Sequence, residues 1–82
     1  MKYLVQFQFD EGQKDKAYAF FETIGPNRHP GVKFLGAWIG KDDDVAFALL
    51  ECEGLEQLAI AGETWSQFGT HLATAVIDIE QY

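Results

Sequence analysis

The sequence predicts an α+β fold whose elements follow the order β-α-β-β-α-β. Four segments have the period-two or continuous apolar pattern of strands, and two segments repeat apolar residues with the period of a helix. Glycine separates most of these segments, at Gly12, Gly25, Gly40 and Gly54. A chain of 82 residues has the size of one domain, which we place over residues 1–82.

The segment Val45–Cys52 is the centre of this prediction. Successive strand side chains point to opposite faces of a sheet, so a strand buried on one side alternates between apolar and polar residues. Here both faces are apolar up to Glu51: one carries Val45, Phe47 and Leu49, and the other carries Ala46, Ala48 and Leu50. Such a strand lies in the middle of its sheet and is covered on both sides.

The first half of the chain supplies three further elements. Residues 2–10 alternate as a strand, with Tyr3, Val5, Phe7 and Phe9 on one face and Leu4, Gln6 and Gln8 on the other. Residues 13–24 have the apolar spacing of a helix, which Gly25 and Pro26 end before a loop over Asn27–Gly31. Val32–Ile39 is a second strand, with Phe34 and Trp38 on the same face, and the turn at residues 40–44 joins it to Val45–Cys52 as a hairpin.

The second half supplies a helix and a strand. Residues 54–68 repeat apolar residues at helical spacing, and Gly62 lies on this apolar stripe. A glycine costs a helix about 1 kcal/mol relative to alanine, so we expect the helix to approach the sheet closely there or to kink. Thr70–Glu80 alternates as the last strand, with Ala73, Ala75, Ile77 and Ile79 on one face.

Right-handed crossovers applied to this order produce the ferredoxin-like arrangement. It has a four-stranded antiparallel sheet, with strands one and three in the centre and both helices on one face. Two helices cover only that face, yet the alternation makes the other face apolar as well. We therefore predict a homodimer through the open sheet face. A monomer with an apolar open face and a different partner protein are the alternatives.

Charge and cysteine content exclude several classes of function. The net charge is −7 and the pI is about 4.5, with no basic cluster beyond one helix start. Nucleic acids and anionic membranes are therefore not expected as partners. The lone Cys52 forms no intramolecular disulfide, which fits a reducing compartment. The first ten residues lack the pattern of a signal peptide, and no apolar run has the roughly 20 residues that span a bilayer. We expect a cytoplasmic protein.

Three stretches resemble a known family. They are Gly31–Ile39 (GVKFLGAWI), the acidic turn that follows and Val45–Glu51 (VAFALLE), together with Trp38 and Trp65. They are similar to the DUF3303 group of small bacterial proteins, and the element order resembles the dimeric α+β barrel proteins of ferredoxin-like fold. The resemblance covers most of the chain, but Thr70-His71-Leu72 lacks the acidic residues usual before the last strand. It implies a fold and a dimer, not a reaction. The wider superfamily includes cofactor-independent monooxygenases, haem-degrading enzymes and small-ligand binders.

Five residues are candidates for binding a ligand. Gln6 and Gln8 place amides on an otherwise apolar face, where they would orient a ligand or bond across the dimer or to water. Phe34, Trp38 and Trp65 pack in the core or the dimer interface, or they line an apolar pocket between the sheet and the helices or the second subunit.

His71 and His29 are the candidates for acid–base catalysis, with solvent exposure as the alternative role for each. No metal-ligand spacing surrounds them, and Asp42-Asp43-Asp44 lacks the spaced ligands of a calcium loop. Cys52 reads as a small buried residue and not as a nucleophile. We predict no metal and no cofactor.

Three functions are consistent with these residues. The first is a small dimeric α+β barrel protein that binds a small, largely apolar ligand. The second is a cofactor-independent enzyme, monooxygenase or isomerase-like, which requires a histidine within hydrogen-bond reach of a pocket. The third is a structural or regulatory interaction module, which predicts a packed interior without a cavity.

Overall fold

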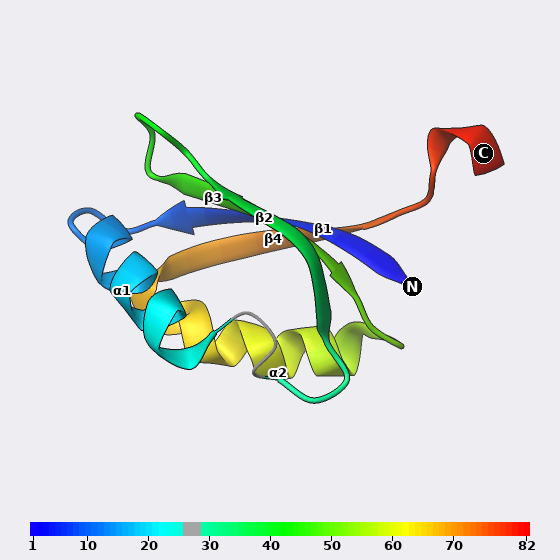
Figure 1. The fold of residues 1–82 in the computed structure, drawn as a ribbon, viewed down its shortest axis with the longest axis horizontal. Helices are drawn as coiled ribbons and strands as arrows, with labels where there is room; N and C mark the ends of the chain where they lie inside the picture. The colour runs from blue at the N-terminus through cyan, green and yellow to red at the C-terminus, as the bar shows by residue number, and fades with distance from the viewer. Residues whose placement is uncertain (26–28) are drawn as a thin grey trace.

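The computed structural model describes residues 1–25 and 29–82, and its fold has two layers (Figure 1). The elements are β1 (Lys2–Phe9), α1 (Lys14–Ile24), β2 (Lys33–Ile39), β3 (Val45–Glu51), α2 (Leu55–Trp65), η1 (Ser66–Phe68), β4 (Gly69–Val76) and η2 (Ile79–Gln81). The strands form an antiparallel sheet in the order β2-β3-β1-β4, and both helices cover one face of it. The predicted ferredoxin-like fold is confirmed, with β1 and β3 in the centre.

The sheet buries the face that carries the aromatic side chains of β1. Tyr3 and Phe9 are buried there, and Leu50 is buried beside Tyr3 because the two residues pair across β1 and β3. Two clusters of buried residues lie between this helix-facing side and the helices: Tyr3, Val32, Leu50, Cys52, Leu58 and Ala61 in one, and Phe9, Ala17 and Phe68 in the other.

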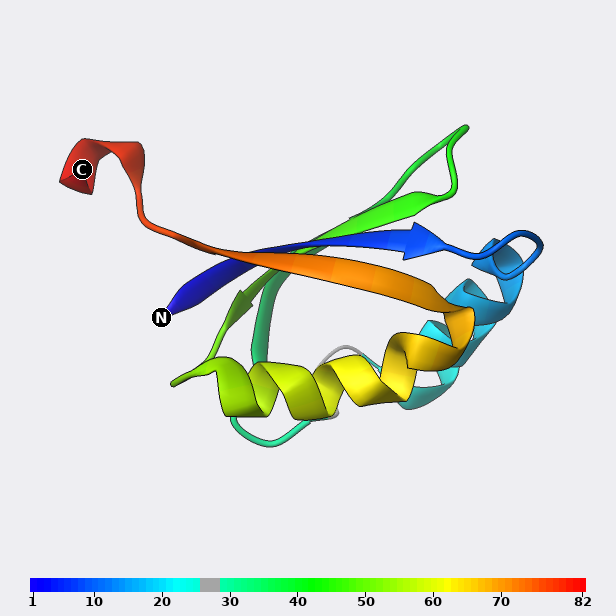
Figure 2. The same cartoon turned by 180° about the vertical axis from the view of Figure 1, so that it is seen from behind.

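Among the described residues, no helix covers the opposite side, which we call the open face (Figure 2). Strand pairing places its side chains in rows that cross the sheet. One row runs Trp38, Phe47, Gln6 and Leu72, and the next runs Gly36, Leu49, Leu4 and Thr74. Leu4, Trp38, Phe47 and Leu72 are 41%, 57%, 36% and 69% exposed. The open face is therefore apolar and uncovered within one chain.

A β-bulge in β2 corrects one prediction. Phe34 pairs with Leu50, whereas Gly36 pairs with Leu49, so two residues of β2 stand opposite one residue of β3. The extra residue reverses the alternation of the side chains that follow it. Phe34 therefore lies on the helix-facing side and Trp38 on the open face, and the prediction that they share a face is wrong.

The predicted helices agree with the structure to within a few residues. Gly25 ends α1 with a φ of 77°, and its N–H donates to the carbonyl of Phe21 at 2.8 Å. The predicted helix over 54–68 is α2 followed by the short η1. Pro26 and the first part of the predicted loop over Asn27–Gly31 lie outside the described residues. Among the described residues, none of the helices has the length and hydropathy needed to cross a membrane.

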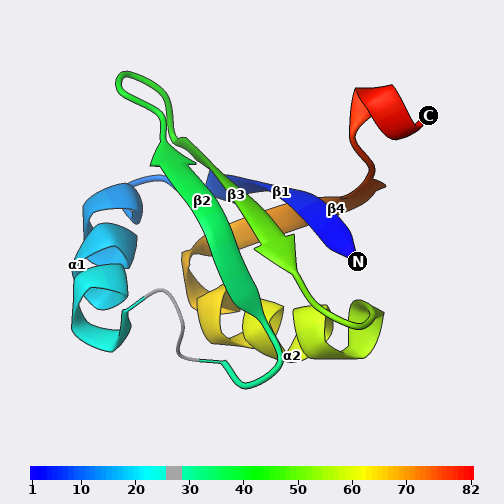
Figure 3. The ribbon, with the colours of Figure 1, turned by 45° about the vertical axis from the view of Figure 1, so that its right-hand side comes forward.

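The last strand is shorter than predicted. We expected it to extend to Glu80, but β4 ends at Val76, which pairs with Lys2 at the start of β1. A strand needs a partner for its backbone N–H and C=O groups, and β1 offers none beyond Lys2. Residues 77–82, which we call the C-terminal arm, leave the sheet instead. All three ribbon views place the arm on the side of the sheet opposite the helices (Figures 1, 2 and 3).

Candidate functional site

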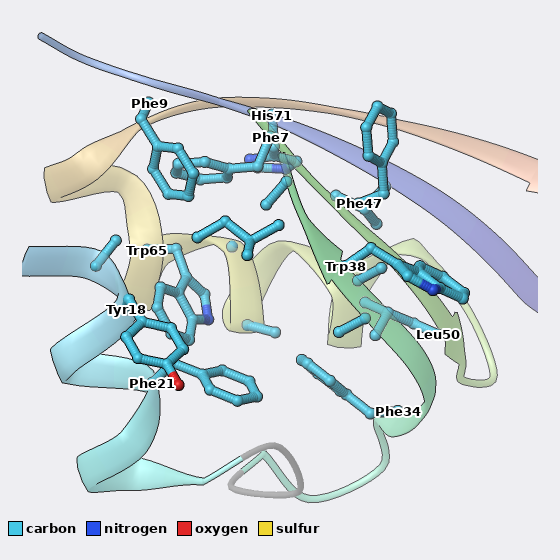
Figure 4. A pocket seen from close by; sticks show the side chains of 18 of the residues that line it. Phe7, Phe9, Tyr18, Phe21, Phe34, Trp38, Phe47, Leu50, Trp65 and His71 are labelled. Atoms are coloured by element: carbon cyan, nitrogen blue, oxygen red, sulfur yellow. The ribbon is translucent and has the colours of Figure 1, made fainter. Parts of the chain in front are cut away.

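A cavity of about 230 Å³ lies between the helix-facing side of the sheet and the two helices (Figure 4). The larger lining side chains are aromatic, and they come from β1, α1, β2 and α2: Phe7, Phe9, Tyr18, Phe21, Phe34 and Trp65. Small residues line the same space from β3, α1 and α2: Ala46, Ala48, Ala17, Ala61 and Gly62. The cavity exists because the small residues do not fill the volume that the large rings enclose.

The aromatic walls support one another. The ring of Trp65 lies 5.3 Å from that of Phe20 at an angle of 77°, and 6.2 Å from that of Phe21. Phe21 in turn lies 6.3 Å from Phe34. Edge-on and tilted contacts at these centroid distances are favourable because of the quadrupoles of the rings. A continuous series of rings thus connects α2, α1 and β2 around the cavity.

Two lining side chains carry polar groups besides the indoles. His71 comes from the edge strand β4, where it pairs with Phe7, and Tyr18 comes from α1 and is 51% exposed. Figure 4 shows His71 beside Phe7 at the sheet and Tyr18 at the helix. The His71 ring lies against the backbone of α2, since a Cβ atom added at Gly62 would be 2.7 Å from its Cε1. The close approach predicted at Gly62 is confirmed, and it is an approach to the His71 ring.

The structure brings together three of the candidate residues. Phe34, Trp65 and His71 all line the cavity. Trp38 also borders it, but its side chain belongs to the open face, where Trp38 pairs with Phe47 and its ring lies over Gly36. The absence of a side chain at Gly36 leaves room for that ring.

The remaining candidates lie elsewhere. Gln6 and Gln8 are exposed on the open face, and Gln8 Nε2 donates a hydrogen bond to the carbonyl of Asp44 at 3.0 Å. His29 does not line the cavity, and its Nε2 is buried without a hydrogen-bond partner within the described part of the chain. The two histidines are therefore not a pair.

Sequence reasoning missed much of the aromatic wall, namely Phe7, Phe9, Tyr18 and Phe21. Phe7 and Phe9 do share the aromatic face of residues 2–10, opposite the face with the two glutamines. Assigning the aromatic face to the helices would have found them. Tyr18 has no comparable signal because it adjoins the apolar stripe of its helix without belonging to it.

The described residues provide neither an exposed cysteine nor a cluster of metal ligands. Cys52 is buried, and its Sγ donates to the carbonyl of Gly54 at 3.4 Å. Across residues 1–25 and 29–82, no group of three or more His, Cys, Asp or Glu side chains has the arrangement to hold a metal ion. The cavity is thus the candidate site.

Comparison with known proteins places the chain in a family. A family model described as "Domain of unknown function (DUF3303)" matches residues 1–82. The chain belongs to the DUF3303 family. This confirms the resemblance of Gly31–Ile39 and Val45–Glu51, whose hairpin contributes β2 and β3 to the sheet. No curated protein and no solved structure matches the chain.

Proposed function

We propose that this DUF3303 protein binds a small, largely apolar molecule in the cavity between its sheet and its helices. The observation that carries this proposal is the composition of the cavity wall, where aromatic and small side chains surround the space and His71 and Tyr18 add polar groups. Binding sites for small molecules have this character, an apolar concavity with a few polar groups that orient the ligand.

The cavity volume indicates the size of the ligand. An engineered protein cavity of about 150 Å³ lined by Leu, Ile and Phe binds benzene. By proportion, a cavity of about 230 Å³ accommodates a molecule of roughly ten non-hydrogen atoms. One or two fused rings have this size, and flat rings also fit walls made of Phe and Trp.

A ligand panel observed by NMR tests this proposal. Toluene, indole and naphthalene are titrated into protein with ¹³C-labelled methyl groups. We expect saturable shifts of the methyl resonances of Ala46, Ala48 and Ala61, which line the cavity, and smaller shifts for Leu4 and Leu72 on the open face. Absence of saturable shifts, or shifts confined to the open face, would contradict the proposal.

A matched pair of variants locates the binding. Ala48→Leu adds three carbon atoms to a residue that lines the cavity, and Ala59→Leu makes the same change on the exposed side of α2. We expect Ala48→Leu to weaken naphthalene binding at least tenfold because it occupies the ligand's volume, and Ala59→Leu to leave it unchanged. Equal affinities in the two variants would place the ligand elsewhere.

A second candidate function is a cofactor-independent enzyme that uses the same cavity. The observation in its favour is His71 in the cavity wall, since histidine is the side chain best suited to acid–base catalysis at neutral pH. The test is conversion of a two-ring phenol, 1-naphthol, in air. Conversion by the wild type that His71→Gln removes without loss of binding supports the enzyme, and no conversion by the wild type rejects it for this substrate class.

The third hypothesis, a structural or regulatory module, requires a filled interior. The cavity of about 230 Å³ is the observation against it.

We also propose that the open face pairs with the same face of a second copy. The described rows from Trp38 to Leu72 and from Gly36 to Thr74 contain no charged side chain. A chain of net charge −7 repels its copies over most of its surface, so these two uncharged rows are where self-association costs least. Most of the cavity wall lies on the other side of the sheet, whereas Trp38 and Phe47 border both the cavity and the open face.

A further inference from the structure

We propose that the C-terminal arm, residues 77–82, clasps a second copy of the chain, with Ile77, Ile79 and Tyr82 packed against the partner subunit. This inference rests on the dimer proposed above and adds a second element to its interface.

The sequence of the arm has a strand pattern without a partner strand. Ile77 and Ile79 alternate with Asp78 and Glu80, as in a strand with one buried face. Within the described part of the chain this segment has no partner strand, because the pairing of β4 with β1 ends at Lys2. Ile77 is 62% exposed, Ile79 is 89% exposed and Tyr82 is fully exposed.

A short turn gathers the apolar side chains of the arm. The N–H of Gln81 donates to the carbonyl of Asp78 at 2.9 Å, and the N–H of Tyr82 donates to that of Ile79 at 3.3 Å. These bonds form the 3₁₀ turn η2, in which residues three apart lie one above the other. Ile79 and Tyr82 thus project from the same side of the turn as one apolar surface.

The position of the arm indicates that its partner is a second copy of the chain. In Figure 1 the arm turns away from the helices, and Figures 2 and 3 likewise show it on the side of the sheet opposite the helices. The arm starts after Val76, at the margin of the open face. Val76 is in the same row across the sheet as Lys2, Glu51 and Lys33. A second copy that covers the open face therefore meets the arm, and two-fold symmetry makes each chain contribute one arm.

The area that a stable dimer buries also favours a second copy as the partner of the arm. Four strands spaced about 4.8 Å apart, with eight residues rising about 3.4 Å each, give the sheet a flat footprint of roughly 500 Å². A stable interface buries about 800 Å² on each partner. A buried tyrosine alone contributes about 150–250 Å², so Tyr82 and the two isoleucines supply about the missing area.

Sedimentation equilibrium of the full chain tests the clasp. Ile77→Ser in the arm is compared with Ile60→Ser on α2, because both isoleucines are 62% exposed in the single chain. A second arm variant carries both Ile79→Ser and Tyr82→Ser, which remove the apolar surface of the turn. We expect both arm variants to raise the dimer dissociation constant at least tenfold and Ile60→Ser to leave it unchanged. Far-UV circular dichroism verifies that each variant is folded.

The outcomes separate the clasp from the dimer itself. A wild-type chain that stays monomeric at millimolar concentration overturns both proposals. A wild-type dimer whose dissociation constant is the same in the arm variants and in Ile60→Ser overturns the clasp and leaves the open-face dimer standing. In a mixed sample of labelled and unlabelled chains, we expect intermolecular NOEs from the Tyr82 ring, and their absence in a dimer also overturns the clasp.

Discussion

At the scale of single residues, the contact between Gly62 and His71 connects the helix layer to the cavity. Glycine in the middle of a helix costs about 1 kcal/mol relative to alanine, and α2 contains Gly62 nevertheless. The His71 ring occupies the space that a Cβ atom would need. The glycine thus lets an imidazole from the edge strand lie close to α2 at the cavity wall.

We predict that the effect of Gly62→Ala on stability depends on His71. In a His71→Ala background, Gly62→Ala should raise the free energy of unfolding by about 1 kcal/mol, the gain in helix propensity. With His71 present the gain should be smaller by about 0.5–1 kcal/mol, because the ring must move away from the new methyl group. Urea denaturation of the four proteins in this cycle measures the coupling. Equal effects of Gly62→Ala in both backgrounds would show that the contact has no energetic consequence.

At the scale of elements, β3 is the strand whose two faces have different roles. Leu50 is buried on the helix-facing side, and Leu49 lies on the open face between Gly36 and Leu4. The strand is apolar on both faces because one face completes the core of its own chain, while the other is partly exposed and is available to a second copy.

We predict that truncating Leu50 mainly affects the folding of the single chain, whereas truncating Leu49 mainly affects dimerisation. Leu50→Ala should lower the free energy of unfolding of the single chain by about 3 kcal/mol, through lost burial and the cavity that it leaves. Leu49→Ala should lower it by less than about 1 kcal/mol and should weaken dimerisation instead. Urea denaturation below the dimer dissociation constant gives the first quantity, and sedimentation gives the second. Similar losses of single-chain stability would mean that the open face is not the exposed side in solution.

At the scale of the whole molecule, two layers leave one sheet face without cover. The cavity and both buried clusters lie between the layers, whereas the open face and the C-terminal arm lie on the far side of the sheet. The proposed ligand site and the proposed dimer interface thus lie mainly on opposite sides of the sheet.

We predict that thermal unfolding depends on protein concentration. When unfolding also dissociates a dimer, a higher protein concentration opposes it by mass action. A hundredfold rise in concentration raises the free energy of unfolding by about 1.4 kcal/mol for each chain. In a domain of this size that corresponds to a rise in Tm of about 5–10 °C. Calorimetry above the dissociation constant measures it, with Leu72→Glu on the open face as the variant whose Tm should stay constant. A constant Tm in the wild type would contradict the dimer.

Much of the fold could be predicted from local pattern. The period-two alternation of residues 2–10, the continuous apolar run of residues 45–50 and the helical spacing around Phe21 and Leu58 depend only on residues a few positions apart. Each of these elements is present. Of the residues in the candidate site, Phe34, Trp65 and His71 could be predicted from the sequence, because aromatic and histidine side chains are candidates for binding or catalysis by their chemistry alone. Phe7, Phe9 and Phe21 were missed because alternation alone leaves open which face of a strand the helices cover.

The sequence by itself therefore determined the order of the elements, the central position of β3 and the presence of more apolar surface than two helices cover. Only the tertiary structure decided which face is buried. The bulge that separates Phe34 from Trp38 depends on pairing with β3, and the end of β4 at Val76 depends on where β1 begins. The cavity is the space that side chains from all four strands and both helices leave between them. These features depend on residues far apart in the chain, and a local pattern carries no information about contacts at that distance.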